Sequence, residues 1–482
     1  MQKIRDVIII GCGVVGAATA YALARYDVDV LILEKENDVS SGTSKANSAI
    51  LHAGYDPRPG SLMATLNVAG SRLSKTICHD LNVPYINCGS LVLAFSDADL
   101  ITLESLLERG RQNGVEGLEI LPPERLFELE PKLSRDVKGA LLAPTAAIVN
   151  PWEFTLAMAE NAVENGTTLR LNEKVTAIRK VTDGYEVETN QDVHRARFVI
   201  NAAGAHADTI HNMIAPPAFR IIPDKGEYYV LDKSEGTRVR HIIFQCPTPL
   251  GKGTLVAPTT DGNLIVGPNN ELTEKKEDTV TSARGLVEVK ERAFKSVPSI
   301  DFSQNVRNFS GVRAATEIDD FIIGEADGSP GFFDLAGIKS PGLTAAAAIG
   351  EMAVTLLAGR GLALTPRVNL VTKRNKIRFN RMSVEEKKTL ISANPDYGQI
   401  VCRCESVTLG EVKAALHSPI PAVSVEGVKR RCHAGSGRCQ GGFCGPRVVE
   451  IIAAEHGISP LDVPLDRAGS TILTGRTKGG DA

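Results

Sequence analysis

The chain has 482 residues, of which 43% are hydrophobic and 23% charged, and its formal net charge at pH 7 is −3. This length suits two or three domains with ordinary cores, and the composition argues against disordered, collagen-like and small disulfide-rich proteins. The slightly acidic balance also disfavours binding to nucleic acid through a basic surface. Residues 1–5 lead directly into an apolar segment without the features of a secretory signal.

The first 34 residues predict a strand, a helix and a second strand. Residues 7–10 form a continuous apolar run, which is typical of a buried parallel strand. An alanine-rich helical stretch extends to about Arg25, and a second apolar strand covers residues 28–33. This order indicates a βαβ unit at the start of an α/β domain.

A glycine-rich turn joins the first strand to the helix. Gly11, Gly13 and Gly16 have the G-x-G-x-x-G spacing, and Glu34 ends the second strand. Gly11 permits the tight turn, Gly13 permits close approach of a pyrophosphate, and Gly16 permits close packing of the helix on the strand. The helix N-terminus favours phosphate groups, while Glu34 can accept hydrogen bonds from a ribose and repels a 2′-phosphate. The turn therefore predicts a dinucleotide other than NADP and leaves NAD and FAD open.

Three later segments favour FAD. Residues 40–48 form a small polar loop suited to phosphates and ribityl hydroxyls, and residues 198–204 and 332–337 are two more strands that end in small residues. Three such elements around one nucleotide imply a discontinuous domain that binds an extended cofactor. The further cofactor contacts that we expect are Thr43, Ser44, Asn47, Ser48, Gly204, Gly337, Gly342, Leu343 and Thr344.

The best candidate for a membrane span is the alanine-rich segment from Gly342 to Leu364. It contains Glu351 and Arg360, and we predict that it is a buried core helix. No helix has the basic amphipathic pattern of a membrane-surface anchor. We therefore expect a cytoplasmic protein without a membrane span.

Cysteines gather near the C-terminus in two close pairs, which are Cys402 with Cys404 and Cys439 with Cys444. Four thiolates in this arrangement suit an iron–sulfur cluster or a zinc ion. The C-x-C spacing favours the cluster, because structural zinc sites generally use C-x-x-C. Cys432 falls outside the two pairs, and we do not assign it as a ligand.

These motifs resemble known families. The glycine-rich turn, Glu34 and the later strand-and-glycine elements resemble the D-amino-acid-oxidase-type FAD oxidoreductases over residues 4–360. Residues 47–54 and 225–229 resemble the branch of L-2-hydroxyglutarate oxidases and anaerobic-type glycerol-3-phosphate dehydrogenases. Residues 398–452 resemble the bacterioferritin-associated-ferredoxin-like [2Fe–2S] domain.

The resemblance implies an α/β fold with a Rossmann-like FAD-binding domain, an inserted mixed-sheet substrate cap and a small four-cysteine iron–sulfur domain. The boundaries that we expect are a discontinuous FAD domain over 1–371 with cap insertions near 86–145 and 220–310, a linker over 372–396, a [2Fe–2S] domain over 397–455 and a tail over 456–482.

Two residues are the first candidates for the substrate site. His52 lies in a stretch that the family places near the flavin, where an imidazole can take a hydroxyl proton as hydride leaves the same carbon. The alternative is a structural histidine bonded to backbone. Arg313 lies where the family keeps an arginine for a substrate anion, and its planar fork suits carboxylate or phosphate. The alternative is an ion pair with one of the acids at positions 317, 319 and 320.

Lys339 is a third candidate, because it lies beside Gly337 and the following helix. There it can reach the flavin ring or a substrate phosphate, and the alternative is a solvated loop lysine. Lys225 and Tyr228 are weaker candidates, since an apolar strand with one polar face has the same pattern.

The expected reaction is the oxidation of a secondary alcohol on a small anionic substrate. The first choice is sn-glycerol 3-phosphate to dihydroxyacetone phosphate, with electrons leaving through the cluster to another subunit or carrier. An L-2-hydroxy acid such as L-2-hydroxyglutarate is the second choice, and an amino or imino acid is the third. Two other classes stay open, namely an electron-transfer subunit that only relays electrons and a zinc-stabilised C-terminal interaction module.

Overall fold

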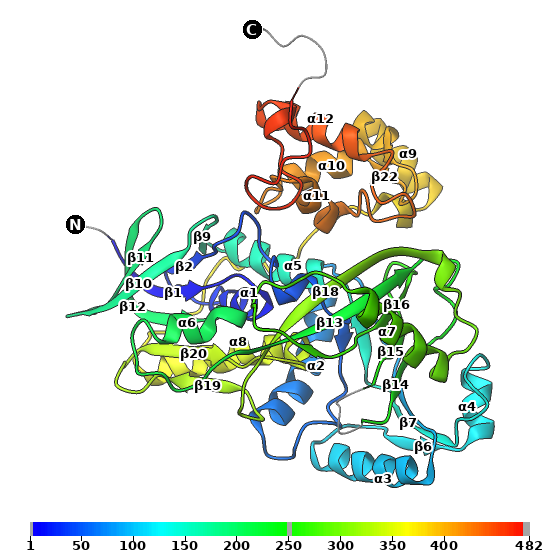
Figure 1. The fold of residues 1–482 in the computed structure, drawn as a ribbon. Coiled ribbons are helices and arrows are strands. Elements are labelled where there is room, and N and C mark those ends of the chain that lie inside the picture. The colour runs from blue at the N-terminus through cyan, green and yellow to red at the C-terminus, as the bar shows by residue number, and fades with distance from the viewer. Residues whose placement is uncertain (1–2, 248–252, 476–482) are drawn as a thin grey trace.

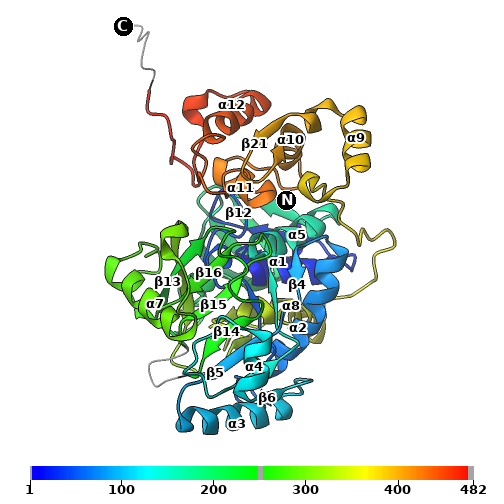
Figure 2. The same cartoon turned by 90° about the vertical axis from the view of Figure 1, so that its right-hand side faces the viewer.

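The computed structural model describes residues 3–247 and 253–475. Part of the second expected cap insertion, residues 248–252, and the end of the expected tail, residues 476–482, lie outside these ranges. Figure 1 shows an N-terminal domain around a central sheet, a cap sheet beside it, and a C-terminal module in orange and red that lies over both. In the view turned by 90°, this module again lies above α5 (Pro151–Glu164) of the N-terminal domain (Figure 2).

The N-terminal domain is organised by a mixed sheet with a parallel centre. Its strands are β1 (Ile4–Ile10), β2 (Val30–Leu33), β9 (Thr168–Arg170), β10 (Val175–Val181), β11 (Gly184–Thr189), β12 (Val193–Asn201), β19 (Ile322–Glu325) and β20 (Phe332–Ala336). β1 pairs in parallel with β2 and β12, so Ile8 lies opposite both Leu31 and Val199. These three side chains are fully buried, which explains why the strands are apolar without alternation.

Helices cover the two faces of this sheet. They are α1 (Val14–Leu23), α2 (Leu62–Asp80), α5, α6 (Ala207–His211) and α8 (Gly342–Gly359). α8 packs against α1 and α2. Within the described ranges it is the one helix long and apolar enough to cross a membrane, with a mean hydropathy of 1.5, yet 61% of it is buried inside the protein. Its burial agrees with the core helix predicted from the sequence.

The cap is a nine-stranded sheet built from two separate parts of the chain. Its strands are β5 (Ser90–Ala94), β6 (Glu119–Leu121), β7 (Gly139–Ala143), β13 (Ile222–Leu231), β14 (Ile242–Gln245), β15 (Leu255–Pro258), β16 (Leu264–Gly267), β17 (Glu271–Leu272) and β18 (Asn305–Ala315). Its helices are α3 (Asp97–Gln112), α4 (Pro123–Leu129) and α7 (Ala283–Ser296). A small sheet of β3 (Ile50–Leu51), β4 (Tyr85–Ile86) and β8 (Ala147–Val149) lies where the cap meets the N-terminal domain.

The C-terminal module, defined here as residues 397–475, has its own hydrophobic core. Its elements are β21 (Ile400–Cys402), β22 (Val407–Thr408), α10 (Leu409–Leu416), α11 (Val425–Cys432) and α12 (Gly445–His456). Val412, Val428 and Ile452 are fully buried in this core. α11 contacts α5, which joins the module to the N-terminal domain.

Two segments are more ordered than the sequence suggested. The expected linker contains α9 (Val384–Ala393), which begins with a capping box of Ser383 and Glu386. Its high charge concealed this helix. Beyond α12 the expected tail turns back onto α11, where the N–H groups of Val425 and Glu426 donate to the carbonyls of Pro464 and Leu465. We call residues 464–471 the C-terminal strap.

Candidate active site and cluster site

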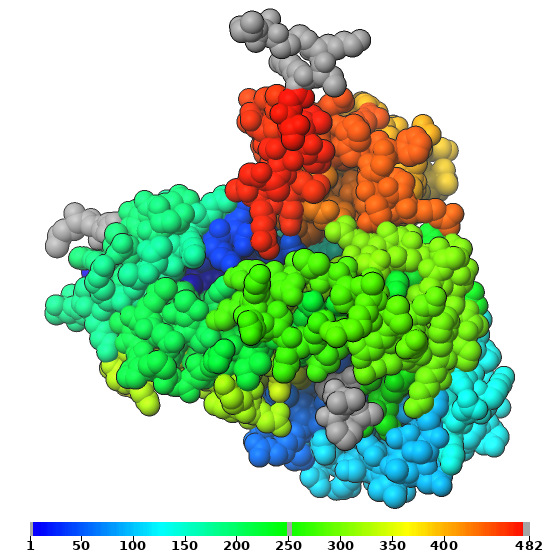
Figure 3. All heavy atoms as spheres, viewed as in Figure 1, coloured from blue at the N-terminus to red at the C-terminus, as the bar shows by residue number. Residues whose placement is uncertain are grey.

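A cavity of about 1610 Å³ lies where the three units meet. Figure 3 shows the hollow from one side, with N-terminal residues in dark blue on its floor, C-terminal residues in red above it and green residues along its lower rim. Sites for a single small molecule generally measure roughly 300–1,000 Å³. The cavity is therefore large enough for an extended cofactor together with a small substrate.

The glycine-rich turn forms one wall of this cavity. Gly11 has a φ of +97°, and a Cβ atom there would lie 2.7 Å from the carbonyl oxygen of Ala202. A Cβ atom on Gly16 would lie only 2.0 Å from the oxygen of Gly11, so the helix can follow the turn this closely only with glycine. The predicted roles of these two glycines in the turn agree with this packing. The turn thereby brings the N-terminus of α1 to the cavity.

Glu34 stands at the end of β2 and supports the turn. Its carboxylate accepts hydrogen bonds from the N–H groups of Cys12, at 2.7 Å, and of Glu36, at 3.0 Å. Burial raises the pKa of Glu34, although these two hydrogen bonds partly oppose the shift. The side chain lines the cavity, so it remains at the place where a ribose acceptor was predicted.

The loop of residues 41–49 also lines the cavity, directly beside the glycine-rich turn. The hydroxyl of Ser44 accepts from the N–H of Val14 in the first turn of α1, at 2.8 Å. Thr43 donates to the carbonyl of Val312 in β18, at 2.6 Å, which ties the loop to the cap. The amide of Asn47 bonds the carbonyls of residues 43 and 44, and Ser48 lies 3.1 Å from the hydroxyl of Tyr228. These bonds give the loop a fixed shape around the cavity.

Most of the expected cofactor residues line the cavity. Those that do are Gly11, Gly13, Glu34, Thr43, Ser44, Asn47, Ser48, Gly204, Gly342 and Leu343. Gly16, Gly337 and Thr344 lie outside the set of residues that line the cavity. Gly16 lies beneath the turn, and the hydroxyl of Thr344 is used inside the protein between the N–H of His52 and the carbonyl of Ile50. Gly337 instead packs near Thr316 and Ile322.

His52 lies in the part of the cavity under the cap sheet. Its Nε2 atom is 3.3 Å from the hydroxyl oxygen of Ser340, and its ring stacks on Phe244 with centroids 5.8 Å apart. The backbone around His52 is held by Thr344 and by the amide of Asn67. The imidazole is thus fixed by neighbours and faces a space open to a substrate.

Arg313 projects from β18 into the same cavity. Its ion-pair partner is Asp224 and not one of the acids at positions 317, 319 and 320. Its Nη1 atom is 2.5 Å from a carboxylate oxygen of Asp224 and 2.6 Å from the side-chain oxygen of Asn270. Of the acids near it in sequence, Asp320 instead accepts from N–H groups at the start of α2. Asp224 lies directly opposite Arg313 in the β13–β18 pair, a register that the sequence did not reveal.

Lys339 and Arg58 add further positive charge to the cavity wall. The Nζ atom of Lys339 is 3.3 Å from Asp319, and that carboxylate is 87% exposed, so the pair is weak. Arg58 was missed in the sequence because no motif distinguishes it. Lys225 is a structural residue, since it is buried between Asp278 and the carbonyl of Val280. Arg313, Lys339 and Arg58 are thus three of the cations that line the cavity and can attract an anionic substrate.

The four predicted cysteines come together as two pairs, and each pair joins one cysteine of the 402/404 segment to one of the 439/444 segment. The Sγ atoms of Cys404 and Cys439 are 3.8 Å apart, and the thiols of Cys402 and Cys444 are hydrogen-bonded to each other. Two thiolates on one tetrahedral metal at about 2.3 Å are separated by about 3.8 Å. A Cβ atom on Gly437 would lie 2.4 Å from Cβ of Cys404, so the loop can close over this thiol only with glycine.

The four thiols form two separate pairs, and among residues 3–247 and 253–475 no group of three or more His, Cys, Asp or Glu side chains is placed to hold a metal ion. The bond from Cys444, with further N–H groups, lowers the pKa of Cys402 to about 6. Burial raises the pKa of Cys432 to about 12, which agrees with leaving it out of the ligand set. Two thiolate pairs with N–H donors match the ligands of a [2Fe–2S] cluster.

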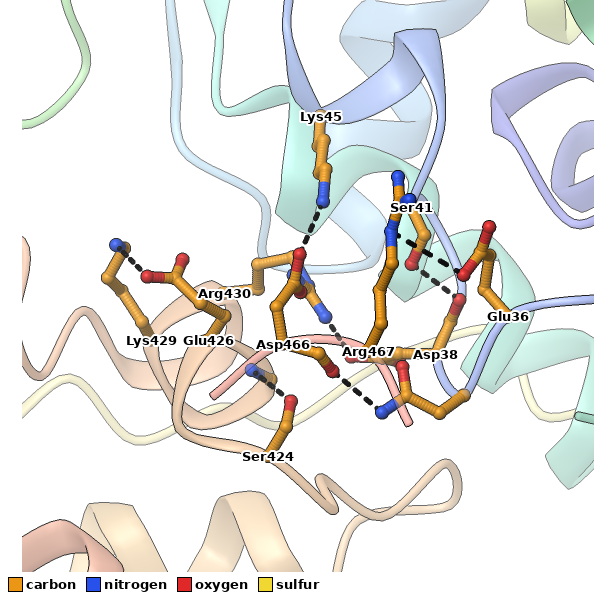
Figure 4. A network of polar contacts seen from close by, with 12 residues as sticks. Glu36, Asp38, Ser41, Lys45, Ser424, Glu426, Lys429, Arg430, Asp466 and Arg467 are labelled. Carbon is orange, nitrogen blue, oxygen red and sulfur yellow. Dashed lines mark hydrogen bonds and ion pairs between the residues drawn. The ribbon is translucent and has the colours of Figure 1, made fainter. Parts of the chain in front are cut away.

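Asp38 joins the 41–49 loop region to the C-terminal module (Figure 4). Its carboxylate is 2.9 Å from Arg430 and 2.8 Å from Arg431, and all three side chains are at least 95% buried. Burial alone would raise the pKa of Asp38, but the two guanidinium groups bring it below its ordinary value. Asp466 of the C-terminal strap bridges Arg430 and Lys45 in the same network.

Glu153, at the start of α5, is a second buried anchor. Its carboxylate is 2.7 Å from Lys376, 2.7 Å from Arg378 and 3.2 Å from Nε2 of His433. Burial opposes ionisation, but Lys376, His433 and Arg378 hold the pKa of Glu153 well below its ordinary value. The expected linker is therefore bound to the N-terminal domain by its basic residues. No sequence signal marked Asp38 or Glu153, because their partners are hundreds of residues away.

The fold, the cavity and the paired cysteines define a flavin-dependent oxidoreductase with an attached iron–sulfur domain. The chain belongs to the FAD dependent oxidoreductase family, which matches residues 6–356, and residues 400–454 match the BFD-like [2Fe-2S] binding domain. The resemblance, the fold class and both cofactors inferred from the sequence are thereby confirmed, and the zinc alternative is set aside.

The relatives point to one part of this family. The chain is 47% identical over 474 residues to the glycerol 3-phosphate dehydrogenase of Caloramator mitchellensis, covering 98% of this chain and 99% of that protein. It is 33% identical over 278 residues to the L-2-hydroxyglutarate dehydrogenase of Escherichia coli K12, covering 56% of this chain and 65% of that protein. The structure of dithionite-reduced L-alpha-glycerophosphate oxidase from Mycoplasma pneumoniae with FAD bound has a TM-score of 0.74 and 33% identity, covering 78% of this chain and 100% of that one.

Proposed function

We propose that the chain oxidises sn-glycerol 3-phosphate to dihydroxyacetone phosphate and passes the electrons through its cluster site to a separate acceptor. The observation that carries this proposal is the 47% identity to a glycerol 3-phosphate dehydrogenase along nearly the whole chain. We also propose that the enzyme works in the cytoplasm; the burial of α8 in the core supports a chain in which this helix does not span a membrane.

The cavity offers the groups that this reaction needs. Arg313, Lys339 and Arg58 supply positive charge for the phosphate, and the fork of Arg313 is already oriented by Asp224. His52 is held by Ser340 and Phe244 where it can take the hydroxyl proton. When bound, FAD accepts the hydride from the carbinol carbon, which leaves the ketone as product.

A 2-hydroxy acid such as L-2-hydroxyglutarate is the second candidate. The L-2-hydroxyglutarate dehydrogenase of Escherichia coli K12 matches 56% of this chain, the mitochondrial one of Homo sapiens matches 72% of it, and the same arginine fork suits a carboxylate. An acceptor subunit or carrier is required under either proposal, because the electrons of each turnover must leave the cluster site.

The test is anaerobic mixing of purified holoenzyme with each substrate while the flavin absorbance is recorded. We expect glycerol 3-phosphate to bleach the flavin and L-2-hydroxyglutarate to leave it oxidised. Bleaching by the hydroxy acid alone would transfer the assignment to the second candidate. Bleaching by neither compound would reject both substrates.

A further inference from the structure

A continuous series of contacts joins the 41–49 loop to the cluster site. Trp152 donates its indole N–H to the carbonyl of Lys45 at 2.8 Å. Its ring centroid lies 6.0 Å from that of His433, which ends α11. Two residues further on, the N–H of Gly435 donates to the sulfur of Cys402. Both rings line the cofactor cavity, and the contacts of His433 and its neighbours continue from there to a cluster ligand.

Both rings are held by the same short segment of α5. Trp152 follows Asn150 and Pro151, which start that helix. The Nε2 atom of His433 is 3.4 Å from the side-chain nitrogen of Asn150 and 3.2 Å from a carboxylate oxygen of Glu153. His433 has a left-handed φ of 65°, a conformation that directs its ring away from α11 and towards α5. The relative position of the two rings is therefore fixed when the module is docked.

We infer that Trp152 and His433 form the route by which electrons pass from the flavin site to the cluster site. The inference rests on the proposed function only in requiring that electrons arrive at the flavin. Electron transfer between two sites weakens steeply with distance and with empty space, so packed rings and a direct N–H···S bond favour this path. Each oxidised alcohol supplies two electrons and two protons. The electrons travel singly to a one-electron acceptor outside the chain, which is reduced twice, and the protons go to water.

The first test compares two route variants with one control. Trp152→Leu removes one ring, and His433→Asn removes the other while asparagine tolerates the left-handed backbone. The matched control is Arg378→Gln, because Arg378 bonds the same Glu153 carboxylate at the same interface but touches neither ring. Anaerobic stopped-flow absorbance follows flavin reduction and cluster reduction separately, and electron paramagnetic resonance counts reduced clusters.

We expect both route variants to slow cluster reduction about tenfold, a rise of about 1.4 kcal/mol in the barrier, with the rate of flavin reduction unchanged. Trp152→Phe, which keeps a ring, should restore most of the rate. Equal slowing in Arg378→Gln would show that the effect is loss of docking and would overturn the inference. Cluster reduction at the normal rate in both route variants would overturn it as well.

A second experiment does not depend on the substrate. The flavin is photoreduced by a light flash with EDTA as electron donor, and cluster reduction is followed in the same variants. Slowing in this experiment, together with no bleaching by glycerol 3-phosphate, would keep the route and reject the proposed function. Trp152 is the only tryptophan of the chain, so its fluorescence in the apoprotein gives a third readout. Titration with FAD should quench it, and unchanged fluorescence at saturating FAD would place Trp152 too far from the flavin for the route.

Discussion

Replacement of Asp38 by asparagine should loosen the C-terminal module from the N-terminal domain. The change leaves Arg430 and Arg431, which are 5% and 3% exposed, without their shared carboxylate. Removing one partner of a buried ion pair generally costs about 3–5 kcal/mol. Arg430 keeps its bond to Asp466, and Arg431 keeps two backbone carbonyls, so we expect the lower end. About 3 kcal/mol corresponds to a docking equilibrium weakened by roughly 100-fold.

Urea unfolding followed by the fluorescence of Trp152 measures this loss, because Trp152 lies at the interface. The control is Glu116→Gln, which breaks an ion pair with Arg72 whose side chains are 79% and 65% exposed and should leave the unfolding curve unchanged. Limited proteolysis should also cut Asp38→Asn between the N-terminal domain and the module at lower protease concentration than the wild type. An Asp38→Asn curve that coincides with the Glu116→Gln curve would refute the reasoning about the buried pair.

Four further outcomes are expected. Arg313→Gln should lower kcat/KM for glycerol 3-phosphate by about 10- to 100-fold, because a charged hydrogen bond is lost, and steady-state kinetics check this. His52→Asn should lower kcat by about 10²–10⁴-fold with little change in KM, as for loss of a general base, which flavin-reduction rates measure. Cys404→Ser should abolish the cluster absorbance while the FAD content stays at the wild-type level, and equal loss of both would contradict separate sites. The module should stay docked from about pH 7 to about pH 5 and undock only below about pH 4. The reason is that Asp38 and Glu153 have lowered pKa values in the folded protein. Such a carboxylate stabilises the folded state above its unfolded pKa, and this stabilisation is lost as the pH falls through the folded pKa. Light scattering or limited proteolysis across that pH range tests whether docking is lost on acidification.

The sequence was most informative where the signal is local. The strand, turn, helix and strand predicted at the N-terminus match β1, α1 and β2 to within a few residues, because apolar runs and glycine spacing act over short distances. The four cysteines were likewise found from spacing within one segment, although the sequence did not show that the pairs cross. Helix α9 was missed, because its charged residues give no apolar stripe.

Contacts between residues far apart in the chain could not be predicted from the sequence. Arg313 and its partner Asp224 are 89 positions apart, and the pairing follows only from the register of β13 on β18. Asp38 and Arg431 are 393 positions apart and meet only after two domains have folded and docked. Similarly, no sequence motif marked Trp152 or His433. Local patterns thus located the cofactors, while the contacts between the units required the three-dimensional arrangement.

The C-terminal strap has a consequence for the order in which the protein matures. Asp466 of the strap bonds Lys45 in the 41–49 loop, so the last part of the chain closes over a loop that borders the cofactor cavity. The whole N-terminal domain leaves the ribosome before the strap is made, and at roughly 5–20 residues per second the interval is on the order of ten seconds. FAD therefore has time to enter the cavity before the strap binds to the 41–49 loop.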